Sequence, residues 1–283
     1  MSLTRLTAVA IASSTAAVVI PSPAFAHDDQ RSNYDGPYIA VSAGAAMQNN
    51  DRKNVVVFDV NRDGNFADTV TTTTGANAFS PGFCNGAATS NSRASGCRGD
   101  KNGREYSVKV GYDAQMGDHF VTGVVLEGAK TDIRDATTAF STTPASYTFI
   151  RKADYSISAR GRFGYTPNGS GLFYVTGGPS YAKIKNRFRT TNTANSFTQV
   201  NANDGEFGYQ MGGGAEFAVT SGVGVGIEYL YNSYKNDDYY VAVGPGTAPA
   251  TNPFIRQGGG TNFRSSGNQL NYHSVRVNLL YKF

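Results

Sequence analysis

The sequence predicts an all-β fold: a transmembrane, antiparallel up-and-down β-barrel of eight strands, with short periplasmic turns and long extracellular loops. Apolar and polar side chains alternate in eight segments, as they do in strands that have one apolar and one polar face. The connections between these segments alternate between short and long. The chain also begins with an export signal and has no later apolar run of about 20 residues that could form a membrane-spanning helix.

Residues 1–26 have the features of a cleaved signal peptide. Arg5 supplies a positive charge, residues 8–20 form a short apolar run, and Ala24-Phe25-Ala26 matches the small-residue cleavage site. We therefore expect residues 1–26 to be removed, residues 27–36 to form a short periplasmic segment and residues 37–283 to form the barrel. Because only helices and closed barrels satisfy every backbone polar group in lipid, this exported chain should cross a membrane with strands.

The composition agrees with this interpretation. Mean hydropathy is −0.35 and glycine is abundant, with 33 residues, which is too polar for a helical membrane protein. It suits a barrel in which half of each strand faces water or a polar lumen. The net charge of +4 is small and does not indicate a nucleic-acid partner, and export argues against one, so none is predicted.

The first four strands are expected at residues 38–47, 104–115, 120–131 and 153–165. Gly36-Pro37 opens the first strand, and a tight turn at residues 116–119 leads into the third. In the second and fourth strands, aromatic and branched side chains share one parity: Tyr106, Val108, Val110 and Tyr112, then Tyr155, Ile157, Ala159, Phe163 and Tyr165.

The last four strands are expected at residues 172–184, 206–219, 223–234 and 269–283. The turn-forming sequence at residues 166–171 opens the first of these, and Thr220-Ser221-Gly222 separates the next two. The register of strand 172–184 stays open, because Phe173, Val175 and Tyr181 favour one parity while Leu172 and Tyr174 favour the other. Pro179 within it indicates a bulge or a weakened ladder bond.

The connection lengths predict the topology. The links after the second, fourth and sixth strands are a few residues long, whereas residues 48–103, 132–152, 185–205 and 235–267 form long connections. This segregation is typical of barrels with short periplasmic turns and long extracellular loops. A soluble β-sandwich has no reason to show it.

The last strand carries a resemblance to a known family. From residue 274 onward its odd-numbered residues are apolar and its even-numbered ones are polar except Leu280, and it ends in Phe283. It resembles the closing strand of Gram-negative outer-membrane barrels, and the whole chain is similar to the small eight-stranded family typified by the OmpA membrane domain, OmpX and opacity-type surface proteins. The resemblance implies residence in the outer membrane of a Gram-negative bacterium, as a monomer among lipid and lipopolysaccharide. It also implies that Phe283 is part of the signal read by the barrel-insertion machinery.

Charged residues on the inward parities predict an ion-pair network in the lumen: Lys109, Asp113, Glu127, Arg160, Arg162, Glu216, Glu228 and Arg276. Buried charges are tolerated only when they are paired and hydrogen-bonded. An eight-stranded barrel is just wide enough for side chains to fill it. We therefore expect a polar plug in which Glu228 is the first candidate partner of Arg276; the alternative is a narrow pore.

The first long loop contains a candidate calcium motif. Asp59, Asn61, Asp63, Asn65 and Asp68 place oxygen atoms at spacings typical of calcium loops. The twelfth position, however, is valine rather than the usual glutamate. The alternative, which we favour, is a polar turn of a hairpin between residues 55–60 and 68–73. No cofactor is predicted, with calcium as the alternative.

Two further features lie in the long connections. Cys84 and Cys97 share one loop of an exported chain and are expected to form a disulfide. Lys183, Lys185, Arg187 and Arg189 share one parity and could contact lipopolysaccharide phosphates if that parity faces outward; the alternative is a solvated loop base.

The histidines do not predict catalysis. His273 and Ser274 are adjacent in a strand, so their side chains point to opposite faces and cannot form a dyad. The predicted function is therefore non-enzymatic: envelope integrity, or surface interaction in which the extracellular loops bind host or environmental ligands. The alternatives are a small porin for ions or small solutes and a lipid A-modifying enzyme.

Overall fold

The computed structural model describes residues 34–48, 54–167 and 169–283. The predicted signal peptide and residues 27–33 of the predicted periplasmic segment lie outside these residues. In the part described, no helix is both long enough and apolar enough to cross a membrane.

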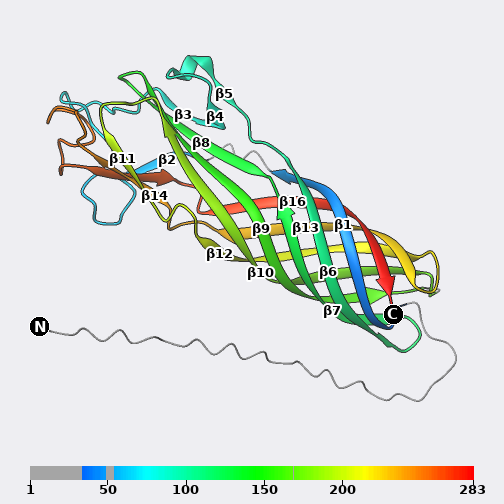
Figure 1. Cartoon of the computed structure of the whole chain (residues 1–283). Coiled ribbons are helices and arrows are strands. Elements are labelled where there is room, and N and C mark those ends of the chain that lie inside the picture. Colours follow the sequence, from blue (N-terminus) through cyan, green and yellow to red (C-terminus); the bar gives the residue numbers. More distant parts are fainter. Residues whose placement is uncertain (1–33, 49–53, 168) are drawn as a thin grey trace, which may run out of the picture. The chain divides into compact units, whose positions relative to one another are not determined.

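Eight antiparallel strands close into a barrel in which each strand pairs with the next one along the chain (Figure 1). The barrel strands are β1 (Gly36–Gln48), β6 (Gly103–Met116), β7 (Phe120–Thr131), β9 (Ala145–Tyr165), β10 (Gly171–Thr190), β12 (Gly205–Ala218), β13 (Val223–Lys235) and β16 (Gln269–Lys282). Antiparallel pairing of β1 with β16 closes the barrel. The predicted fold class and all eight predicted strands are confirmed. β9 and β10 run beyond their predicted ends at the side of the long connections.

The long connections carry the remaining elements. A four-stranded sheet has the order β11 (Ser196–Val200), β14 (Tyr240–Gly244), β15 (Thr261–Ser265) and β2 (Val56–Asp59). Beyond the barrel, β8 (Arg134–Ser141) pairs with the extension of β9, and β3 (Gly82–Asn85) pairs with β8. β4 (Ala87–Ala88) and β5 (Cys97–Arg98) form a short hairpin around the 3₁₀ turn η1 (Arg93–Ser95).

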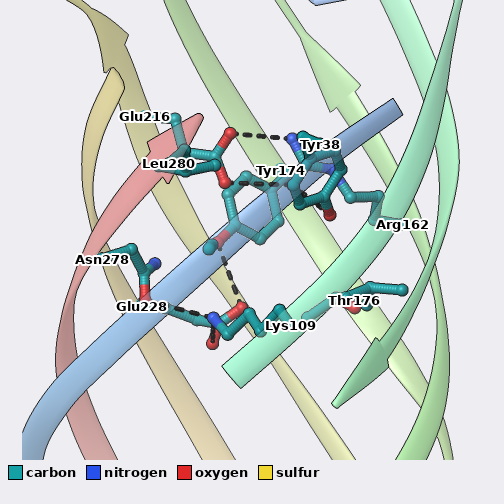
Figure 2. Close-up of a pocket in the computed structure, with 11 residues that line it drawn as sticks. Tyr38, Lys109, Arg162, Tyr174, Thr176, Glu216, Glu228, Asn278 and Leu280 are labelled. Atoms are coloured by element: carbon teal, nitrogen blue, oxygen red, sulfur yellow. Dashed lines mark hydrogen bonds and ion pairs between the residues drawn. The ribbon is translucent and has the colours of Figure 1, made fainter. Parts of the chain in front are cut away.

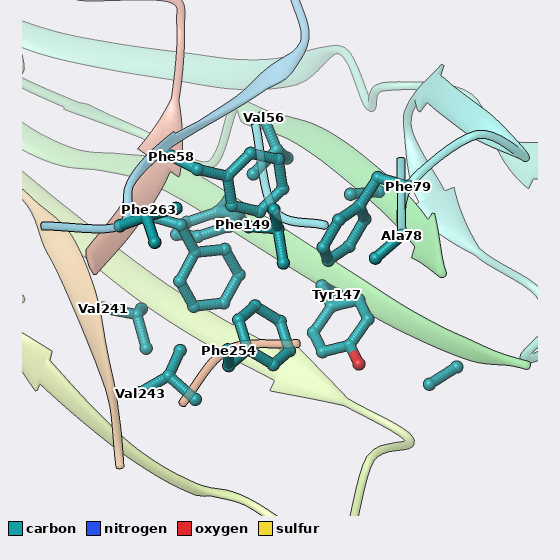
Figure 3. Packing of buried hydrophobic residues seen from close by; sticks show 14 of the residues in the cluster. Val56, Phe58, Ala78, Phe79, Tyr147, Phe149, Val241, Val243, Phe254 and Phe263 are labelled. Carbon is teal, nitrogen blue, oxygen red and sulfur yellow. The ribbon is translucent and has the colours of Figure 1, made fainter. Parts of the chain in front are cut away.

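These elements enclose a hydrophobic core of their own, which we call the cap core (Figure 3). Phe263 stands at its centre, with ring centroids at 5.0 Å from Phe149 and 5.3 Å from Phe188. Phe188 of the β10 extension and Phe197 of β11 pack against this core. Its buried residues come from the first, second and last long connections, including the extension of β9: Val56, Phe58, Val60, Val70, Ala78, Phe79, Ala139, Ala145, Tyr147, Phe149, Tyr239, Val241, Val243, Phe254 and Phe263. The connections therefore form a packed unit, the cap, rather than separate polar loops.

The hairpin expected within the first connection is only partly present. β2 pairs with β15, which comes from the last connection, and an isolated bridge between Phe58 and Asp68 is what remains of the expected pairing. Pairing with β15 places Phe58 against the ring of Phe263, with centroids 5.9 Å apart. Burial of these aromatic rings in the cap core favours the distant partner over the local one.

The exposure of its side chains shows which residues of β10 face the lumen and which face outward. Phe173 and Val175 point outward, 52% and 63% exposed, whereas Leu172 is fully buried in the lumen. The irregularity in pairing with β9 lies between Lys183 and Ile184 rather than at Pro179. Pro179 faces Tyr209 of β12 in an unshifted register, and the ladder to β9 has no pair there.

Candidate functional site

The part of the lumen nearer the cap contains a network centred on Arg276 of β16. Its guanidinium lies 2.5 Å from Oε1 of Glu127 and 2.9 Å from Oε1 of Glu105, and it also contacts Glu228 directly. Glu127 lies on β7 and Glu105 on β6, and neither strand is a neighbour of β16. The side chains therefore meet inside the barrel. The Arg276 side chain is completely buried, and water cannot screen its charge.

Two more cations complete this network. Lys109 Nζ lies 2.7 Å from Oε2 of Glu228, and Arg160 Nη2 lies 2.6 Å from Oε2 of Glu127. Asn278 accepts a further hydrogen bond from Lys109 at 3.1 Å. The network thus balances the charges of Lys109, Arg160 and Arg276 against those of Glu105, Glu127 and Glu228. Such balance is what allows charges to stay ionised in a dry interior.

A second network lies nearer the periplasmic turns and is centred on Arg162 (Figure 2). Its guanidinium donates two parallel hydrogen bonds to Glu216, at 3.0 and 2.9 Å, and its Nε lies 3.1 Å from Oδ1 of Asp113. The Tyr174 ring packs against the guanidinium with 4.4 Å between the ring centroid and Cζ. The Tyr38 hydroxyl accepts a hydrogen bond at 3.1 Å.

Little free space remains between the two networks. The cavity lined by Tyr38, Lys109, Arg162, Glu216 and Glu228 has a volume of about 10 Å³. This is close to the smallest volume that can hold one water molecule. A second cavity of about 10 Å³ lies next to Tyr34 and Lys282 at the periplasmic end.

All eight predicted lumen residues point into the barrel, are buried and belong to one of the two networks. Arg276 does contact Glu228, its predicted partner, but it shares Glu127 and Glu105 as well. The sequence interpretation missed Glu105 and the tyrosines at positions 38 and 174. Glu105 has the same parity as Lys109, so the alternation could have revealed it.

The candidate calcium loop is held together by its own hydrogen bonds. The two carboxylate oxygens of Asp59 accept the backbone N–H groups of Asp63 and Gly64, at 3.0 and 3.1 Å. The Asn65 N–H and the Asn61 side chain hold the pKa of Asp63 below its usual range. Asp68 accepts the N–H of Val60 at 2.8 Å. Among the described residues no cluster of three or more His, Cys, Asp or Glu side chains could hold a metal ion, and calcium binding stays untested.

The remaining predicted residues lie outside the lumen. Cys84 and Cys97 form the predicted disulfide. The basic stripe Lys183, Lys185, Arg187 and Arg189 points outward from β10, where Lys185 pairs with Asp154 at 2.5 Å. Phe283 lies at the periplasmic end with its ring edge-on to Tyr281.

The geometry around His273 is not that of a nucleophile and its base. His273 faces outward, and its Nδ1 lies 2.6 Å from the hydroxyl of Tyr229. Ser274 faces inward and donates a hydrogen bond to Glu105 at 2.9 Å. The two side chains lie on opposite faces of β16, as the strand period requires.

Comparison with known proteins shows which family has this architecture. Residues 12–283 match the family described as outer membrane protein beta-barrel domain. The chain is 28% identical over 180 residues to the 31 kDa outer-membrane immunogenic protein of Brucella melitensis biotype 1, an alignment that covers 62% of this chain and 65% of that protein. The chain thus spans less than two thirds of the length of the curated relatives it matches.

Solved structures of outer-membrane proteins are also similar. OprG from Pseudomonas aeruginosa aligns with a TM-score of 0.44 and 11% identity, covering 88% of this chain and 97% of that one. The attachment invasion locus protein Ail of Yersinia pestis aligns with a TM-score of 0.33 and 13% identity, covering 87% and 99%. With its family match over nearly the whole sequence, the chain belongs to the outer membrane protein β-barrel family and resides in the outer membrane of a Gram-negative bacterium.

Proposed function

We propose that this protein is a non-enzymatic, non-conducting surface protein whose barrel holds the cap outside the cell, where the cap binds host or environmental ligands. The observation that carries the proposal is the cap core. Fifteen buried hydrophobic residues from three of the long connections pack together there, and Phe188 and Phe197 from the remaining connection pack against them. Loops that only join strands have no need of a core, whereas a binding surface gains affinity when it is ordered before the ligand arrives.

The packed lumen supports the non-conducting part of the proposal. An ion crossing the barrel would have to pass both networks, separating Arg276 from Glu127 and Glu228 and also Arg162 from Glu216. Separating buried pairs costs about 3–5 kcal/mol each, so thermal opening should be infrequent. Planar-bilayer recordings of the purified protein test this directly. Reproducible openings of a single size would favour the small porin instead.

The outward basic stripe on β10 supports a role in envelope integrity. Lys183, Arg187 and Arg189 lie on the outer face of β10, beyond Tyr181. Tyr181 belongs to the outward aromatic residues that mark the edge of the apolar band in such barrels. At that height the stripe would meet lipopolysaccharide phosphates. Replacing its basic residues with alanine should raise the sensitivity of cells to detergents and bile salts.

Surface binding can be tested with cells that display the protein. Adhesion to an epithelial monolayer and to immobilised serum proteins would be compared for the wild type and for a variant whose residues 240–265 are replaced by a Gly-Ser linker. The proposal expects the variant to insert normally but lose adhesion, because this segment supplies Phe254 and Phe263 to the cap core. If the wild type and the variant adhere equally, the cap has no part in adhesion and the proposal is wrong.

A further inference from the structure

The outer wall of the barrel has a groove of about 410 Å³ over β6, β7 and β9. Strand register explains its shape. Val108, Gly128 and Ile157 lie side by side in one outward row, and Tyr106, Lys130 and Tyr155 lie in the next row toward the cap. Gly128 has no side chain and forms the floor of the groove. Val108 and Ile157, on either side of it, form the apolar walls. Lys130 stands at its cap-side end.

The walls are exposed and apolar. Val108 and Ile157 are 61% and 60% exposed on the wall of the barrel, so each presents a side to the groove. Tyr106 and Tyr155 flank the cap-side end, where aromatic side chains of such barrels meet the membrane interface. The groove therefore begins at the headgroup level of the outer leaflet and runs into the apolar layer.

Basic side chains outnumber acidic ones at the cap-side end of the groove, where the exposed carboxylate of Asp132 accepts the backbone N–H of Arg104 at 2.7 Å. Lys130 is exposed, and so is Arg104 on β6 beside it. Lys152 of β9 pairs in register with Lys185 of β10. Asp154 lies close by, and its carboxylate is engaged by Lys185. The charge of this region suits an anionic headgroup that has an apolar chain attached to it.

We infer that this groove holds one acyl chain of a lipid A molecule, with a lipid A phosphate on Lys130. An apolar chain would fill the space over Gly128, and the ammonium would donate a charge-assisted hydrogen bond to the phosphate. Lipid A is the phosphorylated lipid of the leaflet that faces the cap. The inference rests on the outer-membrane placement alone and does not require ligand binding by the cap or the basic stripe on β10.

Gly128→Leu tests the groove without disturbing the fold. A Cβ atom built on Gly128 meets no atom within 4 Å, so the new side chain can occupy the groove itself. Gly161→Leu is the matched control, because Gly161 also faces outward and the nearest atom to its Cβ is 4.0 Å away. Gly161 lies deeper in the apolar band, in register with Val124 of β7 and Gly177 of β10.

Lys130→Glu tests the headgroup contact. Lys235→Glu is its control, because Lys235 is an exposed lysine at the same end of the barrel on β13, and β16, β1 and β6 separate β13 from β7. Each purified protein would be titrated with lipid A, and separately with phosphatidylglycerol, and bound lipid counted by native mass spectrometry. Heat-modifiable electrophoretic mobility would verify that every variant is folded.

The inference expects the wild type to retain one lipid A. Gly128→Leu, which fills the space for the acyl chain, and Lys130→Glu, which removes the charge-assisted contact to the phosphate, should each weaken retention about tenfold. Gly161→Leu and Lys235→Glu should retain it as the wild type does. The inference is overturned if folded Gly128→Leu retains lipid A normally, if either control loses it equally, or if phosphatidylglycerol binds as strongly as lipid A.

Discussion

Replacing Arg276 with methionine removes a cation that three buried carboxylates share. The remaining cations, Lys109 and Arg160, contact Glu127 and Glu228 but are not in an ion pair with Glu105. Among the described residues, Arg276 is the one cation paired with Glu105. The variant therefore leaves an uncompensated charge in a site that is almost fully shielded from water.

Breaking a buried ion pair by removing one partner costs about 3–5 kcal/mol, because the other charge stays buried without compensation. We expect Arg276→Met to destabilise the barrel by about this amount. Adding Glu105→Gln should recover part of the loss, since it removes the stranded charge and leaves an amide that can still bond to Ser274, which lies 2.9 Å from Glu105. Adding Glu216→Gln instead should bring no recovery, because Glu216 belongs to the network of Arg162.

The assay is equilibrium unfolding in urea of protein refolded into detergent micelles. The chain has no tryptophan, so far-ultraviolet circular dichroism and the heat-dependent mobility shift would report the folded fraction. A loss below about 1 kcal/mol for Arg276→Met, well short of the expected range, would refute the reasoning. Equal recovery by Glu105→Gln and Glu216→Gln would also refute it, because it would mean that the pairings in the lumen are not specific.

Three other predictions concern the cap. Phe263→Ala should cost the cap about 3–5 kcal/mol of local stability, as large-to-small changes in a core do, and make it sensitive to protease while the barrel strands stay protected. Replacing Cys84 and Cys97 with serine should lower the stability of their loop by about 3 kcal/mol in the chain-entropy estimate, measured by hydrogen exchange across residues 84–97; unchanged exchange would contradict this. Millimolar calcium should produce no heat in calorimetry, because Asp59 and its neighbours already accept backbone N–H groups; a binding isotherm that Asp59→Ala abolishes would favour the calcium loop.

By itself the sequence determined the fold class, the eight strands and the residues that face inward. This was possible because a strand repeats every two residues and lipid requires one apolar face, so a short window of sequence is enough to assign each side chain. Lys109, Glu127 and Arg276 were assigned to the lumen in this way. Where both faces are apolar, as at Leu172 and Phe173 of β10, the pattern is ambiguous, and only barrel closure showed which of them is inside.

Only the tertiary structure decided which residues meet. Arg276 contacts Glu105 although β1 lies between their strands, because Gly44 of β1 stands in register with both and has no side chain between them. This contact depends on the register of the strand pairs. The sequence likewise did not reveal the cap core. Phe254 and Phe263 stand in polar sequence without periodicity, and Phe58 stands in a short apolar run for which a local hairpin was expected. These residues meet only after closure brings the connections to the same end. Local alternation reports which way a side chain faces, whereas its partners are set by contacts between segments far apart in the chain.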